Sequence, residues 1–460
     1  MGRVEWTGDR VRVAAPGDTG GGEGAACARR DEQGTLVLRT LASRQMTSCL
    51  SEGENPPVPA SDAAEVDAAA VDQGHVRATA PTPTVLGLHD GNMGHATFLR
   101  HLDAGLATVG GVHYRPVSMT EAVRGDRPFR IVRRLVAPPN RKVAARLRGE
   151  AAASLGARRE LRRQIGRRCD GPTDVVHAHT QAQAYFLPAL AQGRSGSRMP
   201  PTVVSIDLTV PLLAAERRWS RELRTLAALE SRTFRRAAHV VAFSDWARRS
   251  VVDDYGLSEA RVTTIPLPVS VPERPVDDGR PSGGRPVRLL FVGSDFVRKG
   301  GPELLSAVRR LPPGDYHLDV CSGDPAAVVP PGLEGVQVHA AVRAGSDELD
   351  RLYSEADVFV FPTRYDQSPN VIVEAMSYGL PIVTTDVGAI SEMVGRDGAC
   401  ASLVPVGTPV KLAEEIATLA GSDARRRAMG LESRRRAIET SSVEAVAKRW
   451  VALFQAVAER

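Results

Sequence analysis

The sequence predicts two parallel α/β domains that face each other across a cleft. Apolar runs typical of buried strands alternate with helix-length segments, and they do so in two separate stretches of the chain. Between the stretches lies a segment rich in proline and glycine, 271–286, which we expect to be a linker. Of the 460 residues, 42% are hydrophobic and 25% are charged, a composition that supports a packed core and excludes wholesale disorder.

Residues 1–80 differ from the rest of the chain. They hold Gly-Gly-Gly-Glu-Gly at 20–24, Asn-Pro-Pro-Val-Pro at 55–59 and a stretch of alanine and aspartate at 60–72, with little hydrophobic periodicity. Such a segment buries too little apolar surface to offset the chain entropy lost on folding. We therefore expect a largely disordered N-terminal extension.

The first domain is predicted to span residues 81–270. It opens with an apolar run, a glycine turn and a helical stretch, which is the order of a buried strand followed by a helix. Similar apolar runs recur at intervals that leave room for a helix between most of them. The expected strands lie at 84–88, 112–116, 174–178, 202–206 and 239–243.

The second domain, residues 287–440, repeats this alternation of strands and helices. Its expected strands lie at 287–292, 316–321, 336–339, 357–361, 381–384 and 402–405. Ligands of open parallel sheets bind beyond the carboxyl ends of the strands, so the cleft between the two domains is the expected site.

A final helix is predicted over residues 441–460. Apolar residues repeat along it every three or four positions, so this face needs a partner surface. They are Val443, Val446, Trp450, Leu453, Phe454 and Val457. The helix either docks on the second domain or crosses back to the first.

A loop with two cations follows the first strand of the second domain. The strand ends at Gly293, and Arg298 and Lys299 lie in the loop. Two glycines and Pro302 then open a helix, whose start offers N–H groups and the positive end of the helix dipole. With a lysine beside them, these groups suit an anion such as a pyrophosphate. The alternative is an ordinary connection whose lysine faces solvent.

Two carboxylates follow the strand expected at 357–361. Asp366 lies in the loop after that strand, and Glu374 lies eight residues later, in the next helix. This spacing can aim both side chains into one pocket, with backbone N–H groups of residues 368–371 between them. The neighbours of Glu374 are apolar, and a carboxylate in that setting needs a hydroxyl or a cation as partner. The alternative is a solvated glutamate on an exposed helix face.

Together these motifs resemble the second half of the retaining family-4 glycosyltransferases of the GT-B fold. The motifs are Gly-Ser-Asp-x-x-x-Lys-Gly, Ala-Asp-Val-Phe-Val-Phe-Pro, Asp-x7-Glu-Ala-Met-x-x-Gly-x-Pro-Ile-Val, and then Gly388 and Glu392. The match is specific over 287–440 and looser over 84–270. The resemblance implies a GT-B fold of two Rossmann-like domains, with a nucleotide-sugar donor on the second.

The resemblance also implies roles for single residues of the second domain. Lys299 would neutralise the donor pyrophosphate, Glu374 would bind the ribose hydroxyls, and Asp366 would face the transferred sugar. The expected donor-binding residues are Gly293, Ser294, Arg298, Lys299, Ser368, Asn370, Val371 and Glu374. The chain departs from the family pattern twice, because Asp366 replaces a glutamate and Ser294 replaces a frequent arginine. Lys299, helped by Arg298, would therefore carry more of the phosphate charge.

The first domain would supply the acceptor side. Gly91, Gly94 and His95 follow the first expected strand, where the family has a glycine loop. His179 follows the third expected strand and resembles a histidine that relatives use in the cleft, and Asp207 stands at a comparable strand end. The alternative for both is a structural hydrogen-bonding role. The expected catalytic residues are Asp366, Lys299 and His179.

The implied reaction transfers a hexose from a nucleoside-diphosphate sugar to an acceptor hydroxyl, with retention of configuration. The departing phosphate would take the acceptor proton. No Asp-x-Asp motif occurs in the chain, so we expect neither a metal nor another cofactor. The acceptor would be a glycan, a lipid or a small molecule, as in polysaccharide or glycoconjugate biosynthesis. Two alternatives stay open: a nucleotide-sugar epimerase of the same fold, and a non-catalytic protein that binds a nucleotide or glycan.

Positive charge is concentrated in one segment of the first domain. Residues 121–168 hold 15 Lys+Arg and 4 Asp+Glu, whereas the whole chain has a net charge of +5. This segment is either a solvated helical face or a surface for anionic lipid, and the scarcity of aromatic residues argues against nucleic acid. The five cysteines are scattered and lack metal-ligand spacing. With no apolar run of membrane length, we expect a cytoplasmic protein, peripheral at the inner face of the membrane if the segment binds lipid.

Overall fold

The computed structural model divides the chain into two units, residues 1–77 and 78–460, which are treated separately. The residues that it describes are 4–7, 10–13, 27–30, 36–39, 82–89, 93–118, 173–185, 187, 200–217, 220–273 and 285–460. The basic segment 121–168 lies outside them, so its predicted lipid association stays a prediction. Across the described ranges, no helix is both long and apolar enough to cross a membrane.

The N-terminal unit contains two short antiparallel strand pairs. Strand β1 (Val4–Thr7) pairs with β2 (Arg10–Val13), and β3 (Cys27–Arg30) pairs with β4 (Leu36–Arg39). The sequence analysis did not predict these strands. Their signal is the alternation of apolar and polar residues in Val-Glu-Trp-Thr and Arg-Val-Arg-Val. The other residues of the expected extension lie outside the described ones.

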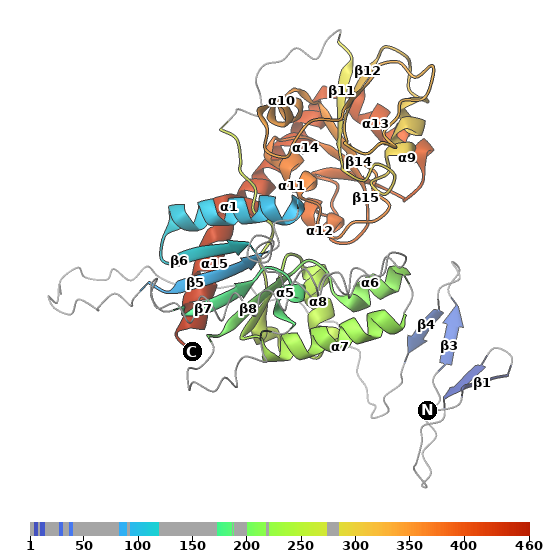
Figure 1. Cartoon of the computed structure of the whole chain (residues 1–460). Helices are drawn as coiled ribbons and strands as arrows, with labels where there is room; N and C mark the ends of the chain where they lie inside the picture. Colours follow the sequence, from blue (N-terminus) through green and yellow to red (C-terminus); the bar gives the residue numbers. More distant parts are fainter. Residues whose placement is uncertain are drawn as a thin grey trace, which may run out of the picture. The chain divides into compact units, whose positions relative to one another are not determined.

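The first α/β domain is built on a six-stranded sheet whose strands are all parallel, in the order β10-β9-β8-β7-β5-β6 (Figure 1). Its strands are β5 (Thr84–His89), β6 (His113–Ser118), β7 (Val175–Ala178), β8 (Thr202–Ile206), β9 (His239–Ala242) and β10 (Val262–Thr264). Its helices are α1 (Met93–Val109), α5 (Gln181–Ala184), α6 (Val210–Arg217), α7 (Arg221–Arg236) and α8 (Asp245–Asp253). All five expected strands are present, and β10 is an addition.

The second α/β domain also has six parallel strands, in the order β13-β12-β11-β14-β15-β16. The strands are β11 (Val287–Val292), β12 (Tyr316–Cys321), β13 (Val336–His339), β14 (Val358–Phe361), β15 (Ile382–Thr385) and β16 (Ala401–Val404). The helices are α9 (Gly301–Val308), α10 (Asp347–Glu355), α11 (Asn370–Ser377), α12 (Ile390–Val394), α13 (Pro409–Ala420) and α14 (Asp423–Arg436). The predicted fold class of two parallel α/β domains is confirmed.

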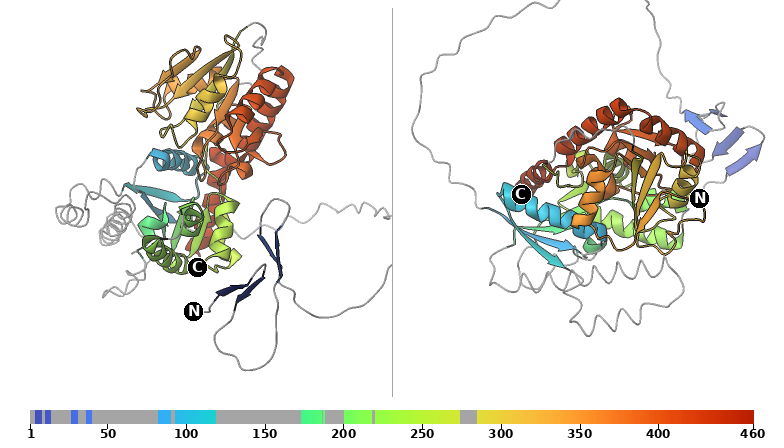
Figure 2. Two further views of the ribbon diagram at one scale, coloured as in Figure 1. Left: turned by 90° about the vertical axis from the view of Figure 1, so that its right-hand side faces the viewer. Right: turned by 90° about the horizontal axis from the view of Figure 1, so that it is seen from above.

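The last helix, α15 (Val443–Ala458), packs in the first domain although it follows the second. Its buried residues Val446, Trp450 and Phe454 join the core formed by α1 and one face of the first sheet. A Cβ atom on Gly105 of α1 would lie 2.9 Å from the Cβ of Ala447, so a glycine permits this close approach. Figure 2 shows α15, in dark red, beside α1, in light blue.

The chain passes between the two domains twice, and the two passages are hydrogen-bonded to each other. The backbone N–H of Val269 donates to the carbonyl of Ser441 at 2.8 Å, and that of Val443 donates to the carbonyl of Val269 at 3.1 Å. The first passage leaves the first domain and the second returns to it. Both crossings therefore lie at one place, beside the start of α15.

Candidate functional site

The strand order places the expected site residues at the point in each sheet where ligands bind. In the second sheet, the chain runs from β11 through β12 to β13 on one side of β11 and then crosses back, so that β14 pairs on the other side of β11. In the first sheet, β5 lies between β6 and β7 in the same way. Such a reversal opens a crevice beyond the carboxyl ends of the strands. The loops after β11 and β14 carry Lys299 and Asp366, and His179 directly follows β7.

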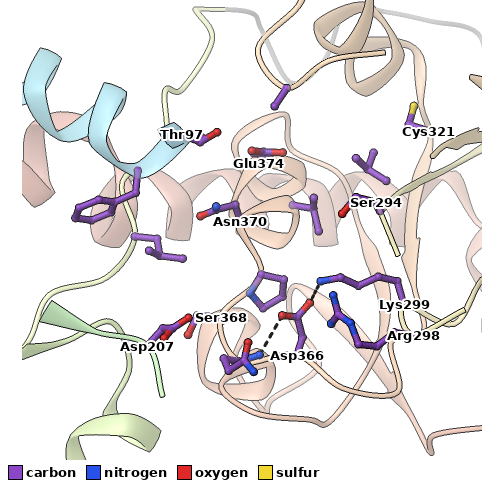
Figure 3. A pocket seen from close by; sticks show the side chains of 18 of the residues that line it. Thr97, Asp207, Ser294, Arg298, Lys299, Cys321, Asp366, Ser368, Asn370 and Glu374 are labelled. Atoms are coloured by element: carbon purple, nitrogen blue, oxygen red, sulfur yellow. Dashed lines mark hydrogen bonds and ion pairs between the residues drawn. The ribbon is translucent and has the colours of Figure 1, made fainter. Parts of the chain in front are cut away.

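A cavity of about 410 Å³ lies at these strand ends and is lined by residues of both domains. Eleven of the expected site residues line it, and Figure 3 shows several of them. The eleven are His179, Asp207, Gly293, Ser294, Arg298, Lys299, Asp366, Ser368, Asn370, Val371 and Glu374. The structure thus brings together residues that are as far as 195 positions apart in the chain.

The expected glycine loop of the first domain is placed differently. Gly94 and His95 lie in the first turn of α1, which begins at Met93, and not in a loop. Gly91 lies outside the described residues, so its expected acceptor-side role stays a prediction.

The sequence predicted an anion site at the start of α9, but this helix start does not line the cavity. The cavity lining in the described structure includes Lys299 but no residue of α9. A Cβ on Gly300, whose φ is +83°, would lie 2.0 Å from the carbonyl oxygen of Pro362, and a Cβ on Gly301 would lie 2.2 Å from the ring of Phe296. These glycines therefore serve close contacts within the protein.

Lys299 and Asp366 form an ion pair on the cavity wall. The Lys299 ammonium donates to Oδ2 of Asp366, which is only 6% exposed (Figure 3). The ammonium also lies 5.2 Å from the centre of the Phe361 ring. Burial lowers the pKa of Lys299, and the carboxylate of Asp366 opposes this shift. A lysine held in this way can exchange its ion-pair partner Asp366 for an anionic ligand.

Arg298 is a second cation of the same loop, and it is held by the protein at two nitrogens. Its Nε donates to Oδ2 of Asp295 at 2.8 Å, and its Nη1 donates to the carbonyl of Tyr365 at 2.7 Å. The guanidinium is therefore fixed next to Lys299 on the cavity wall. Ser294, at the position where an arginine is frequent in the family, also lines the cavity.

Glu374 lines the cavity and is half-buried. Its Oε2 accepts a 2.9 Å hydrogen bond from the hydroxyl of Tyr353 on α10. Its neighbours on α11, Ile372 and Ala375, are fully buried. Burial raises the pKa of Glu374, while the Tyr353 hydroxyl and the charge of Arg100 on α1 oppose the shift. The positive charge of Arg100, in the first domain, therefore favours the ionised form of this carboxylate in the second.

His179 is held firmly on the wall that the first domain contributes. Its ring is 2% exposed and stacks on Phe98, with ring centres 4.4 Å apart. The backbone N–H of His179 donates to Oε1 of Gln183 at 3.1 Å, and its backbone carbonyl accepts from the Ser205 hydroxyl at 3.0 Å. Asp207, just beyond β8, lines the same wall. A stacked imidazole and a carboxylate of the first domain thus line the same cavity as the cations of the second.

Several cavity residues escaped the sequence analysis. Thr97 and Phe98 come from α1, and Phe243 follows β9. Cys321, Ser322 and Gly323 stand at the end of β12, and burial raises the pKa of the Cys321 thiol to about 12. The Ser-Gly pair directly after a predicted strand was a usable signal. The role of Phe98, in contrast, depends on how α1 is rotated, which no local pattern specifies.

Two family models match the chain over most of its length. The model described as Glycosyltransferase Family 4 matches residues 77–272, and the model described as Glycosyl transferases group 1 matches residues 286–422. In sequence, the chain is similar to the MMP alpha-(1->4)-mannosyltransferase of Mycolicibacterium hassiacum. The two are 29% identical over 317 residues, which cover 66% of this chain and 74% of that enzyme.

Solved glycosyltransferase structures share the fold. Sucrose-phosphate synthase from Thermosynechococcus elongatus superimposes with a TM-score of 0.61 at 17% identity, covering 82% of this chain and 99% of that one. HepE from Anabaena, solved in complex with UDP-glucose, gives a TM-score of 0.56 at 16% identity, with 81% and 99% of the chains covered. The matches to both halves of the chain, with the two facing parallel sheets, agree with one another. The chain therefore belongs to the family-4 glycosyltransferases and has the GT-B fold.

Proposed function

We propose that this glycosyltransferase moves a hexose from a nucleoside-diphosphate sugar to an acceptor hydroxyl, with retention of configuration and without a metal. The observation that carries the proposal is the placement of Lys299 and Glu374 in one cavity. The first is a cation suited to a diphosphate, and the second is a half-buried carboxylate suited to sugar hydroxyls. A nucleotide sugar presents both groups in one molecule.

The donor diphosphate would bind between the loop after β11 and the start of α11. Lys299 and Arg298 supply two positive charges there, and Pro369, Asn370 and Val371 line the cavity where α11 begins. The first N–H groups of a helix have no partner within it and favour an anion. A charge pair near 4 Å contributes about 4 kcal/mol at an effective dielectric of 20. This charge would stabilise the phosphate as it leaves.

The sugar end of the donor would lie toward Asp366 and His179. Both line the cavity, one from each domain. The relatives support a hexose, since one is named a mannosyltransferase and HepE was solved with UDP-glucose. The base and the identity of the hexose are left to experiment.

Bond making and breaking would occur on one face of the sugar. The bond from the anomeric carbon to the leaving phosphate oxygen breaks, the acceptor oxygen bonds to that carbon, and its proton passes to the phosphate. Positive charge on the sugar and negative charge on the phosphate develop together, and we assign their stabilisation to Asp366 and Lys299 respectively. The absence of an Asp-x-Asp motif from the sequence supports a site whose cations are side chains.

A thermal-shift panel tests the proposal. The full chain is heated with UDP, GDP and ADP and with their glucose and mannose conjugates. We expect one nucleotide series to raise the melting temperature, with the sugar conjugate then undergoing slow hydrolysis. Binding without hydrolysis or transfer would favour the non-catalytic alternative, and interconversion of the sugar would favour an epimerase. No shift with any nucleotide would contradict the donor assignment.

A further inference from the structure

Glu392 of the second domain caps a helix of the first. It lies on α12, which is on the side of the second domain that faces the first (Figure 1). Its carboxylate accepts hydrogen bonds from the backbone N–H groups of Asp245 and Trp246, the second at 2.9 Å. These residues open α8. The contact joins positions 147 and 146 residues apart, so it is a link between the two domains.

The two N–H groups that Glu392 binds belong to the set that a helix leaves without an internal acceptor. The side chain of the N-cap residue Ser244 accepts from Ala247 instead, at 3.2 Å. The side chain of Asp245 is also engaged, because its Oδ1 accepts from Arg248 and from Thr264. Glu392 thus supplies acceptor oxygens for two N–H groups of the helix start that the side chains of Ser244 and Asp245 do not bind.

On its own side, Glu392 is tied to the loop that carries Asp366. The N–H of Ala389 donates to the carbonyl of Gln367 at 2.8 Å. A Cβ on Gly388, whose φ is +57°, would lie 2.2 Å from the carbonyl oxygen of Asp366, so the two backbones are in contact. Arg436 fixes the other end of α12 by donating to the carbonyls of Met393 and Glu392 at 2.8 and 2.9 Å.

On the other side, the capped helix start is continuous with the His179 wall. Phe243 lies two residues before Asp245 and lines the cavity. Its ring centre is 4.9 Å from that of Phe98 and 5.9 Å from that of His179. A shift of the start of α8 would therefore move the aromatic surface on which His179 rests.

We propose that Glu392 is a positioning residue that sets the separation between the Asp366 loop and the His179 wall. The proposal rests on the proposed function, in which donor and acceptor meet between these walls. Glu392 touches neither ligand. Removal of the Glu392 side chain should leave the donor-binding loop intact within the second domain. The distance between that loop and the first domain should then no longer be fixed.

Hydrogen exchange on the full chain tests the contact without any ligand. Glu392→Ala should make the amides of Asp245 and Trp246 exchange about tenfold faster or more, because each loses a hydrogen bond to a charged group. Glu392→Gln, with one acceptor oxygen, should give an intermediate rate. Glu414→Ala is the matched control, since Glu414 pairs with Lys411 on the exposed face of α13 in the same domain. Unchanged exchange in Glu392→Ala would overturn the proposal.

Donor kinetics test the positioning role separately. With the nucleotide sugar selected by the thermal-shift panel, Glu392→Ala should keep its donor Kd within about threefold while kcat falls about tenfold or more, since misplacement of reacting groups slows turnover. The parent value of kcat with faster exchange would overturn the positioning role, as would a loss of donor affinity equal to the loss of kcat. If the parent binds no nucleotide sugar, the proposed function fails. The exchange result still decides whether Glu392 links the two domains through the start of α8.

Discussion

The hydroxyl of Tyr353 donates a 2.9 Å hydrogen bond to Oε2 of Glu374. Tyr353 is itself 2% exposed and comes from α10, whereas Glu374 comes from α11. The bond orients the carboxylate that we propose binds the donor ribose. It also explains how a carboxylate is tolerated in an apolar wall, because a buried charge needs a hydrogen-bond partner.

Tyr353→Phe should weaken nucleotide-sugar binding about tenfold, because a hydrogen bond to a charged group is lost and Glu374 becomes less well oriented. Isothermal titration of the parent and the variant measures the effect. Tyr378→Phe is a suitable control, since Tyr378 stacks on Tyr353 but bonds to Asp350. Equal donor affinity in all three proteins would argue against Glu374 as a donor ligand.

Asp366→Asn should separate donor binding from turnover. Loss of the ion pair releases Lys299 for the diphosphate, so a nucleoside diphosphate without sugar should bind as tightly as in the parent or several-fold more tightly. Hydrolysis or transfer should fall about a hundredfold, the usual effect of removing one stabilising group from a transition state. Competition binding and initial rates give the two numbers. A parallel loss of diphosphate affinity would show that Asp366 supports the donor loop rather than the sugar.

Donor binding should depend on pH on both sides of neutrality. Lys299 is charged below its pKa, which burial lowers from 10.5, so donor affinity should decline at a less alkaline pH than for an ordinary lysine. Glu374 is charged above its pKa, which burial raises from 4.5, so the acid limb should begin above that value. Titrations across the pH range should show both limbs in the parent. Lys299→Ala should lack the alkaline limb, and Glu374→Gln should lack the acid limb. A limb that persists in its variant would show that another group causes it.

The first domain should lose stability in mild acid because of His177. This buried histidine lies 3.0 Å from the Tyr114 hydroxyl and 2.9 Å from that of Ser205, and burial lowers its pKa from 6.5 to about 3. Between these values the unfolded chain holds the extra proton, so the free energy of unfolding falls as the pH falls below 6.5.

From pH 6.5 to pH 5.5 the loss should be about 1 kcal/mol from His177 alone, measured by urea unfolding. His177→Gln should flatten this slope, whereas His113→Gln, at an exposed histidine, should not. An unchanged slope in His177→Gln would contradict the assignment.

The sequence predicts most of this fold because its strands are continuous apolar runs. Residues 289–291 of β11, Leu-Leu-Phe, are buried on both faces of a parallel sheet, so their composition alone marks them. Strand β10 is three residues long, too short for such a signal. The direction of α15 could not be predicted either, since its apolar stripe fits any apolar partner and only the structure shows that α1 is that partner.

In the candidate site, too, some residues could be predicted from the sequence and others could not. Lys299, Asp366 and Glu374 lie within one domain at a spacing that the sequence displays, so their meeting in one cavity could be anticipated. Tyr353 and Glu392 could not be assigned contacts, because each depends on the approach of elements remote in sequence. The glycines at the start of α9 gave a wrong expectation of an anion site. A glycine in a sequence indicates close approach of another group, but it does not tell whether that group is a ligand or, as here, Pro362 and Phe296 of the protein.

If Lys299 and Glu374 hold a nucleotide-sugar donor, slow hydrolysis of that donor depends on both side chains. Initial rates are compared, with the sugar nucleotide chosen by the thermal-shift panel, for the parent, Lys299→Ala, Glu374→Gln and the surface control Lys411→Ala. We expect Lys299→Ala and Glu374→Gln to lose about a hundredfold or more in kcat/KM while Lys411→Ala matches the parent. Parent-level hydrolysis in both Lys299→Ala and Glu374→Gln would contradict the donor assignment.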